Sequence, residues 1–138
     1  MRGVLVHEFL QSPDMLSKPS HEEHDRWIAA LDDVVIPGIV AADEHDLRPR
    51  QEQAFRGLAS LRCGLVLGPP GTGKTSTVAW MAAGYMVQCR REGRDCRVLV
   101  TAFTRAAIGN LLEAIALRLK WLRDDASVFF VGPPPSDE

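Results

Sequence analysis

One glycine-rich octapeptide constrains this chain more than any other feature: Gly68-Pro69-Pro70-Gly71-Thr72-Gly73-Lys74-Thr75. It fits the pattern G-x-x-x-x-G-K-[ST], in which the glycines allow a tight turn whose backbone N–H groups face inward and surround phosphate oxygens. Lys74 places a positive charge beside the β- and γ-phosphates, and the hydroxyl of Thr75 is a natural ligand for Mg²⁺. The octapeptide, together with Ser76, therefore predicts a site for a nucleoside triphosphate and Mg²⁺, with Lys74 and Thr75 as the catalytic residues.

The segments around the octapeptide predict an α/β fold. Apolar runs at 65–67, 97–101 and 127–131 are typical of buried strands, and helical spacing of apolar residues covers 76–91 and 106–121. Strands that alternate with helices predict a parallel sheet between helical layers. We therefore expect a three-layer P-loop fold with a small parallel sheet of three strands, which is an incomplete version of the usual domain.

The residues before the octapeptide predict two further helices. Ser20-His21-Glu22-Glu23 is a capping box that opens a helix to about Asp33, and Pro37-Gly38 should end that unit. A second helix should begin near Pro49, a residue type that suits the first helical position. The pattern divides the chain into an acidic N-terminal segment, residues 1–46, and a P-loop domain, residues 47–138.

The charge and cysteine content limit the possible partners and compartment. Residues 1–46 carry three basic and ten acidic side chains, whereas the remainder carries thirteen basic and eight acidic ones. The basic part is thus the phosphate-binding part, which is compatible with a nucleic-acid partner. No apolar run reaches the roughly 18 residues that a membrane span needs, so we expect no membrane partner. An odd number of cysteines without paired spacing predicts reduced thiols and a cytoplasmic location.

Three segments resemble motifs of superfamily 1 helicases, in the branch of the nonsense-mediated-decay helicases and the replication nuclease-helicases. Leu47-Arg48-Pro49-Arg50-Gln51-Glu52-Gln53-Ala54 is similar to the adenine-reading Q motif, although Arg48 replaces an asparagine. The octapeptide has the sequence that is typical of this branch. Residues 98–112 are similar to motif Ia, although Gly109 replaces an aspartate. The resemblance implies a partial RecA-like domain over about residues 47–131, which binds ATP with Mg²⁺ and contacts single-stranded nucleic acid.

The resemblance also assigns individual residues. An amide such as that of Gln51 can donate to adenine N7 and accept from the adenine amino group, although a solvent-facing glutamine is the alternative. Phe103, Thr104 and Arg105 stand where motif Ia contacts nucleic acid. Phe103 can stack on a base or belong to the core, and Arg105 can neutralise a phosphate or be an ordinary surface arginine.

One element of an ATPase is missing from the sequence. No apolar run after the octapeptide ends in Asp or Asp-Glu, the pattern that supplies a second carboxylate for the metal and the attacking water, and the later helicase motifs are also absent. Whether the chain alone is an enzyme therefore stays open. The sequence leaves three interpretations: the ATP-binding segment of a split or truncated helicase, a stand-alone ATP-binding or regulatory module without turnover, and a fragment of an AAA+ ATPase.

Overall fold

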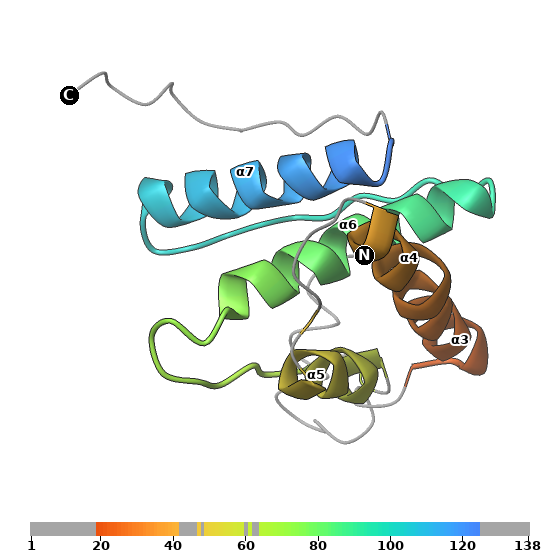
Figure 1. The fold of residues 1–138 in the computed structure, drawn as a ribbon, viewed down its shortest axis with the longest axis horizontal. Coiled ribbons are helices and arrows are strands. Elements are labelled where there is room, and N and C mark those ends of the chain that lie inside the picture. Colours follow the sequence, from red (N-terminus) through yellow and green to blue (C-terminus); the bar gives the residue numbers. More distant parts are fainter. Residues whose placement is uncertain (1–18, 42–46, 48, 60, 62–63, 125–138) are drawn as a thin grey trace, which may run out of the picture.

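The computed structural model describes residues 19–41, 47, 49–59, 61 and 64–124 of the chain. This part is built from helices joined by irregular segments (Figure 1). In chain order they are α3 (His21–Ala29), the π-helix η1 (Ala30–Val35), α4 (Ile36–Ala41), α5 (Pro49–Ala59), α6 (Lys74–Arg91) and α7 (Arg105–Trp121). None of these helices is both long enough and apolar enough to cross a bilayer.

The prediction of an α/β fold with a parallel sheet is wrong for the described residues, which contain no β-strand. The two apolar runs at 65–67 and 97–101 lie instead in irregular connections on either side of α6. Leu65, Leu67 and Leu99 are largely exposed there. Parallel strands need a hydrogen-bonding neighbour and cover on both faces, and neither run has these. The third expected strand, 127–131, lies outside the described residues.

The predicted start of the first helix is confirmed. The hydroxyl of Ser20 accepts a hydrogen bond from the backbone N–H of Glu23 at 3.2 Å, and the Glu23 carboxylate accepts one from the backbone N–H of Ser20 at 3.0 Å. These reciprocal contacts satisfy N–H groups that have no acceptor within the helix. The capping box therefore fixes where this helical unit begins.

The predicted end of the helix near Asp33, and of the unit at Pro37-Gly38, is wrong, because the chain stays helical to Ala41. Pro37 has no N–H, so it cannot donate the usual helical hydrogen bond to the carbonyl four residues earlier, that of Asp33. The Asp33 carbonyl accepts a hydrogen bond from Nη1 of Arg91 in α6 at 3.0 Å. The wider turn of η1 just before the proline is a common way for a helix to absorb such a local interruption.

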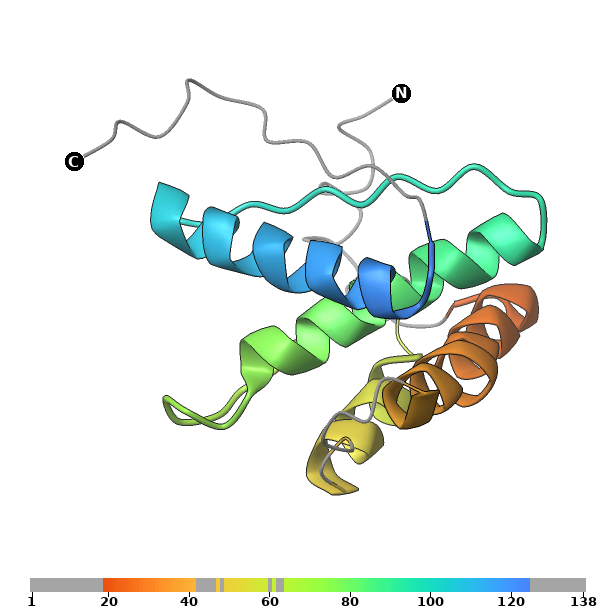
Figure 2. The ribbon, with the colours of Figure 1, turned by 45° about the horizontal axis from the view of Figure 1, so that its top comes forward.

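Helix α6 lies in the middle of the described structure, with α7 along one side and the N-terminal helices and α5 on the other (Figures 1 and 2). Two groups of buried side chains hold this arrangement together. The first joins η1, α6 and α7: Val34, Ala79, Ala82, Ala83, Val87, Ile115 and Leu119. The second joins η1, α4, α5 and α6: Leu31, Val35, Ile39, Phe55 and Trp80.

A buried arginine fastens α3 to the C-terminal end of α6. Arg26 is 4% exposed, and its Nε and Nη2 donate to the carboxylates of Glu92 at 2.6 Å and Glu22 at 2.7 Å. The hydrogen bond from Arg26 is the main reason why the pKa of Glu92 lies below its ordinary value. Arg94 also donates to Glu22, at 2.6 Å. Residues 19–41 are therefore packed and paired against the helix that follows the octapeptide.

Candidate phosphate-binding site

The octapeptide leads directly into α6, as the motif requires. Gly71 and Gly73 both have φ near +79°, a left-handed conformation that glycine adopts without strain. Gly73 is the N-cap of α6, and its carbonyl accepts from the backbone N–H of Thr77 at 2.9 Å. The N–H groups of the first turn, from Lys74 to Ser76, have no acceptor within the helix. They form a helix N-terminus that favours an anion.

The ammonium group of Lys74 lies within the loop. Its Nζ donates to the carbonyl of Gly68 at 2.6 Å and to that of Pro69 at 2.7 Å. The Thr72 hydroxyl donates to the same Pro69 carbonyl at 2.9 Å. The loop thus holds one positive charge beside the helix N-terminus. The ammonium of Lys74 is bonded to neutral carbonyls, and charged phosphate oxygens would be stronger acceptors for it.

A cavity of about 610 Å³ lies between the octapeptide and α5. Its lining comes from α5, the octapeptide, the two residues before it and the beginning of α6: Pro49, Arg50, Gln51, Ala54, Val66, Leu67, Gly68, Pro69, Thr72, Lys74 and Thr77. Most of this lining is apolar, with a few polar groups near the loop, a composition typical of small-molecule sites. The volume falls within the range of known ligand pockets, which is roughly 300–1,000 Å³.

The structure places the Gln51 side chain against the octapeptide. The Gln51 side chain donates from Nε2 to the Gly73 carbonyl at 3.3 Å. A Cβ atom added to Gly73 would displace this amide, whereas the left-handed φ of Gly73 is what favours glycine there. Gln51 is one helical turn before Phe55, which is fully buried, so the core fixes the face of α5 that carries the amide.

An ion pair sets the position of α5. Arg56 donates to the carboxylate of Asp32 in η1 through both Nη atoms, at 3.2 and 2.7 Å, and to Glu52 within α5. The bidentate geometry gives directional as well as electrostatic hold. The wall of the cavity that carries Gln51 is therefore anchored to the N-terminal helices.

The loop groups fit a nucleoside phosphate, but they offer few ligands for a metal ion. The glycine-rich loop leads into the N-terminus of α6, Lys74 lies on the carbonyls of that loop, and the cavity with a mostly apolar lining lies beside it. Thr75 carries the hydroxyl suited to Mg²⁺, whereas no carboxylate lines the cavity among the described residues. That part of the chain also contains no cluster of three or more His, Cys, Asp and Glu side chains able to hold a metal.

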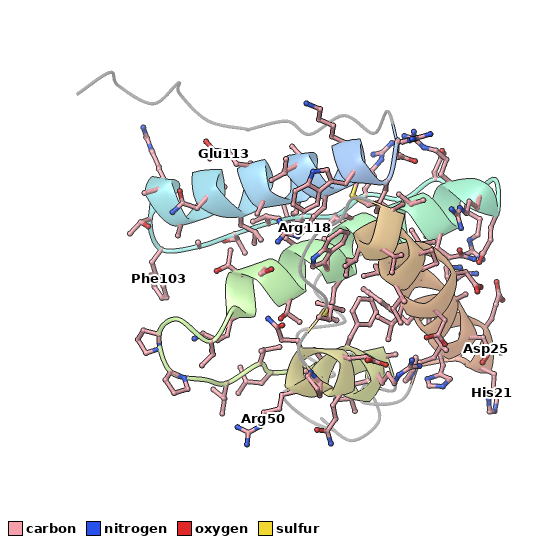
Figure 3. The ribbon with its side chains drawn as sticks, in the orientation of Figure 1. His21, Asp25, Arg50, Phe103, Glu113 and Arg118 are labelled. Carbon is pink, nitrogen blue, oxygen red and sulfur yellow. The ribbon has the colours of Figure 1, made fainter. Side chains whose placement is uncertain are left out.

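The three residues predicted to contact nucleic acid lie at the beginning of α7. Phe103, Thr104 and Arg105 are all exposed, so the alternative of Phe103 as a core residue is wrong. The Thr104 hydroxyl accepts from the backbone N–H of Ala107 at 3.2 Å and caps α7. Figure 3 shows Phe103 protruding from this turn, at the same end of the molecule as the octapeptide loop in Figures 1 and 2.

The sequence interpretation missed Arg118, which reaches the phosphate-binding loop from α7. Its Nη2 donates to the hydroxyl of Ser76 at 2.7 Å. The position of Arg118 in the sequence could have revealed this contact. Residue 118 lies three residues after Ile115 and three before Trp121, on the apolar stripe of that helix. A charged side chain on such a stripe indicates a buried contact, and here it is with the first turn of α6.

Comparison with known proteins gives one match. No curated protein and no solved structure matches this chain significantly. The family model described as "AAA domain" matches residues 46–136, about two thirds of the chain. The matched segment contains the octapeptide, α5 with Gln51, and α7. The chain therefore belongs to the AAA domain family, with a helicase-like P-loop NTPase domain over residues 46–136.

Proposed function

We propose that the chain is the nucleotide-binding segment of a superfamily 1 nucleic-acid helicase and that it binds ATP with Mg²⁺ through residues 68–76. The observation that carries the proposal is the shared cavity of α5 and the octapeptide, with Gln51 hydrogen-bonded to Gly73. A phosphate site needs only the loop. An amide held beside that loop on a separate helix adds a group that can select the base.

Each part of the site has a separate role in this proposal. The N–H groups of the loop and Lys74 hold the phosphates, and the Thr75 hydroxyl is a ligand of Mg²⁺. When bound, Mg²⁺ neutralises charge on the β- and γ-phosphates. Gln51 pairs with adenine, whose amino group and N7 match the acceptor and donors of an amide. Pro49 and Ala54 supply apolar surface beside the base.

Nucleic acid is the proposed second partner, at the turn before α7. An exposed aromatic ring at Phe103 can stack on a base, and Arg105 can pair with a phosphate. Support comes from their exposure and from the position of this turn, which is at the same end of the molecule as the nucleotide site (Figures 1 and 2). The contact is expected to involve single strands, which leave base faces free for stacking.

A second candidate function is a stand-alone module that binds ATP without turnover. The observation that favours it is the cavity lining, which contains Lys74 but no carboxylate among the described residues. Such a lining holds the nucleotide ground state and lacks a group to orient the attacking water. Measurement of phosphate release separates the two functions, and its expected outcome is argued in the Discussion.

Base selection tests the assignment of Gln51. We expect the wild-type chain to bind Mg-ADP more tightly than Mg-GDP and expect Gln51→Ala to reduce that preference by roughly fivefold to tenfold, as for the loss of one neutral hydrogen-bonded contact of about 1–1.5 kcal/mol. Competition against a fluorescent adenine nucleotide measures both affinities. Gln53→Ala on the exposed face of the same helix is the matched control and should leave the preference unchanged. A preference that persists in Gln51→Ala would show that another group reads the base.

A further inference from the structure

The carbonyl of Gly73, at the N-cap of α6, accepts hydrogen bonds from two parts of the chain. Thr77 of α6 donates two of them, from its backbone N–H at 2.9 Å and from its hydroxyl at 3.0 Å. Gln51 of α5 donates a third, from Nε2 at 3.3 Å. Because a carbonyl accepts and does not donate, the nitrogen of the Gln51 amide must be the atom that faces it. The orientation of the proposed base-reading amide is therefore set at this carbonyl.

Thr77 belongs to a deeply packed part of α6. It is 2% exposed, and Ala79 and Trp80, two and three residues later, are 0% and 3% exposed. Threonine has few allowed χ1 rotamers in a helix, and its hydroxyl can bond the carbonyl four residues earlier. The Thr77 hydroxyl therefore approaches Gly73 from a fixed side. Together with the backbone N–H, it holds the Gly73 carbonyl in one direction.

The hydrogen bond from Gln51 depends on that direction. Its length of 3.3 Å is the greatest of the three and lies just beyond the usual range for N–H donors, about 2.7–3.2 Å. Such a bond weakens steeply when its alignment is lost. Gly73 has no side chain to restrict its own backbone, which in glycine adopts many conformations. Without the Thr77 hydroxyl, the carbonyl keeps only the backbone hydrogen bond to α6, and the Gln51 amide loses a fixed partner.

We propose that Thr77 is a positioning residue for base selection and that its hydroxyl acts through the Gly73 carbonyl on the amide of Gln51. The inference rests on the proposed binding of an adenine nucleotide and adds a residue of α6 to the base-reading part of that site. Thr77 and Gln51 both line the cavity beside the octapeptide. Loss of the hydroxyl should lower the ratio of adenine to guanine affinity, whereas a general weakening of the site lowers both affinities equally.

A purely structural role of Thr77 predicts a different order of variants. Thr77→Val replaces the hydroxyl by a methyl group of similar size, whereas Thr77→Ser keeps the hydroxyl and removes the methyl group. If Thr77 only fills space in α6, serine is the more disruptive residue, because it leaves a small cavity. If the hydroxyl positions the amide, valine is the more disruptive residue for base preference.

The experiment measures the ratio of the Mg-GDP to the Mg-ADP dissociation constant, by competition against a fluorescent adenine nucleotide. This ratio cancels any general loss of folded protein. We expect Thr77→Val to lower it roughly threefold, a size typical of residues that share one hydrogen-bond network, and expect Thr77→Ser to retain it. The ratio in the double variant of Thr77→Val and Gln51→Ala should equal that in Gln51→Ala, because the hydroxyl then has no amide to position. Thr101→Val, which removes a hydroxyl at an exposed position, is the matched control and should leave the ratio unchanged.

Equal ratios in Thr77→Val and Thr77→Ser overturn the inference, and a reduced ratio in Gln51→Ala then leaves the proposed function intact. A raised ratio in Thr77→Val also overturns it, since the hydroxyl would then only compete with the amide for the Gly73 carbonyl. Additive losses in the double variant have the same consequence. If Thr77→Val does not fold, Thr77→Ala compared with Thr77→Ser isolates the same hydroxyl, and equal ratios in these two overturn the inference. An unchanged ratio in Gln51→Ala, or a wild-type chain that binds no ADP, would refute the proposed function and the inference with it.

Discussion

Replacement of Phe55 by alanine is expected to destabilise the folded chain by about 3–5 kcal/mol, the usual cost of removing a fully buried aromatic ring. Phe55 has no exposed surface and lies in the group of buried side chains that joins η1, α4, α5 and α6. Its ring also meets Trp27 of α3 edge-on, with 6.1 Å between centroids. The substitution leaves a cavity where α5 packs against α3, η1, α4 and α6.

A loss of that size is a large fraction of the stability of an ordinary domain, which is about 5–15 kcal/mol. Urea denaturation followed by helical circular dichroism measures it. The chain offers a matched control, because Phe103→Ala truncates the same side chain at a fully exposed position and should change stability by no more than about 0.5 kcal/mol. Equal effects of the two substitutions would mean that α5 does not pack against the N-terminal helices as described.

Very slow ATP turnover by the 138-residue chain is the second large expected effect. No carboxylate lines the described cavity, so the acidic group that usually organises the metal and the attacking water is not found there. The lining contains only Lys74 and Arg50 as cations, and Arg50 lies in the first turn of α5 (Figure 3). P-loop proteins that lack an arginine finger lose roughly 10³–10⁵ in rate.

We therefore expect phosphate release on the order of 10⁻³ s⁻¹ or slower, with or without single-stranded nucleic acid. A continuous phosphate assay measures this rate, with Lys74→Ala as the background. A rate on the order of 1 s⁻¹ that disappears in Lys74→Ala would show that the chain contains a catalytic carboxylate. It would also exclude the module without turnover.

The helices could be predicted from sequence because their signals are local. Ser20 and Glu23 are three residues apart, and the apolar stripe of α7 repeats over its own length, so each is visible without knowledge of the fold. The end of the first helical unit at Pro37 was predicted wrongly. The Asp33 carbonyl, to which Pro37 cannot donate, accepts from Arg91, which is more than fifty residues away in the sequence, and local rules do not predict such a contact.

The prediction of strands failed because a sheet depends on contacts between segments that are distant in the sequence. An apolar run such as Leu65-Val66-Leu67 shows that a segment suits a sheet, but not that a neighbour and two covering layers are present. The candidate site likewise contains parts that local sequence predicts and a part that depends on tertiary packing. The loop was predicted from its own motif and Gln51 from the resemblance to the Q motif, whereas the contact between Arg118 and Ser76 depends on how two helices cross.

Titration of the chain with Mg-ATP, compared with Lys74→Ala, tests the proposed nucleotide site most directly. The Lys74 ammonium is the one charge that lies within the loop, on the carbonyls of Gly68 and Pro69. Lys120→Ala, on the exposed surface of α7, controls for loss of a positive charge elsewhere. By isothermal calorimetry we predict that Lys74→Ala weakens binding by about 1.5–3 kcal/mol, the worth of a charge-assisted contact, and that Lys120→Ala has no effect. Equal affinities of the wild-type chain and Lys74→Ala for Mg-ATP would contradict the assignment of this loop as the nucleotide site.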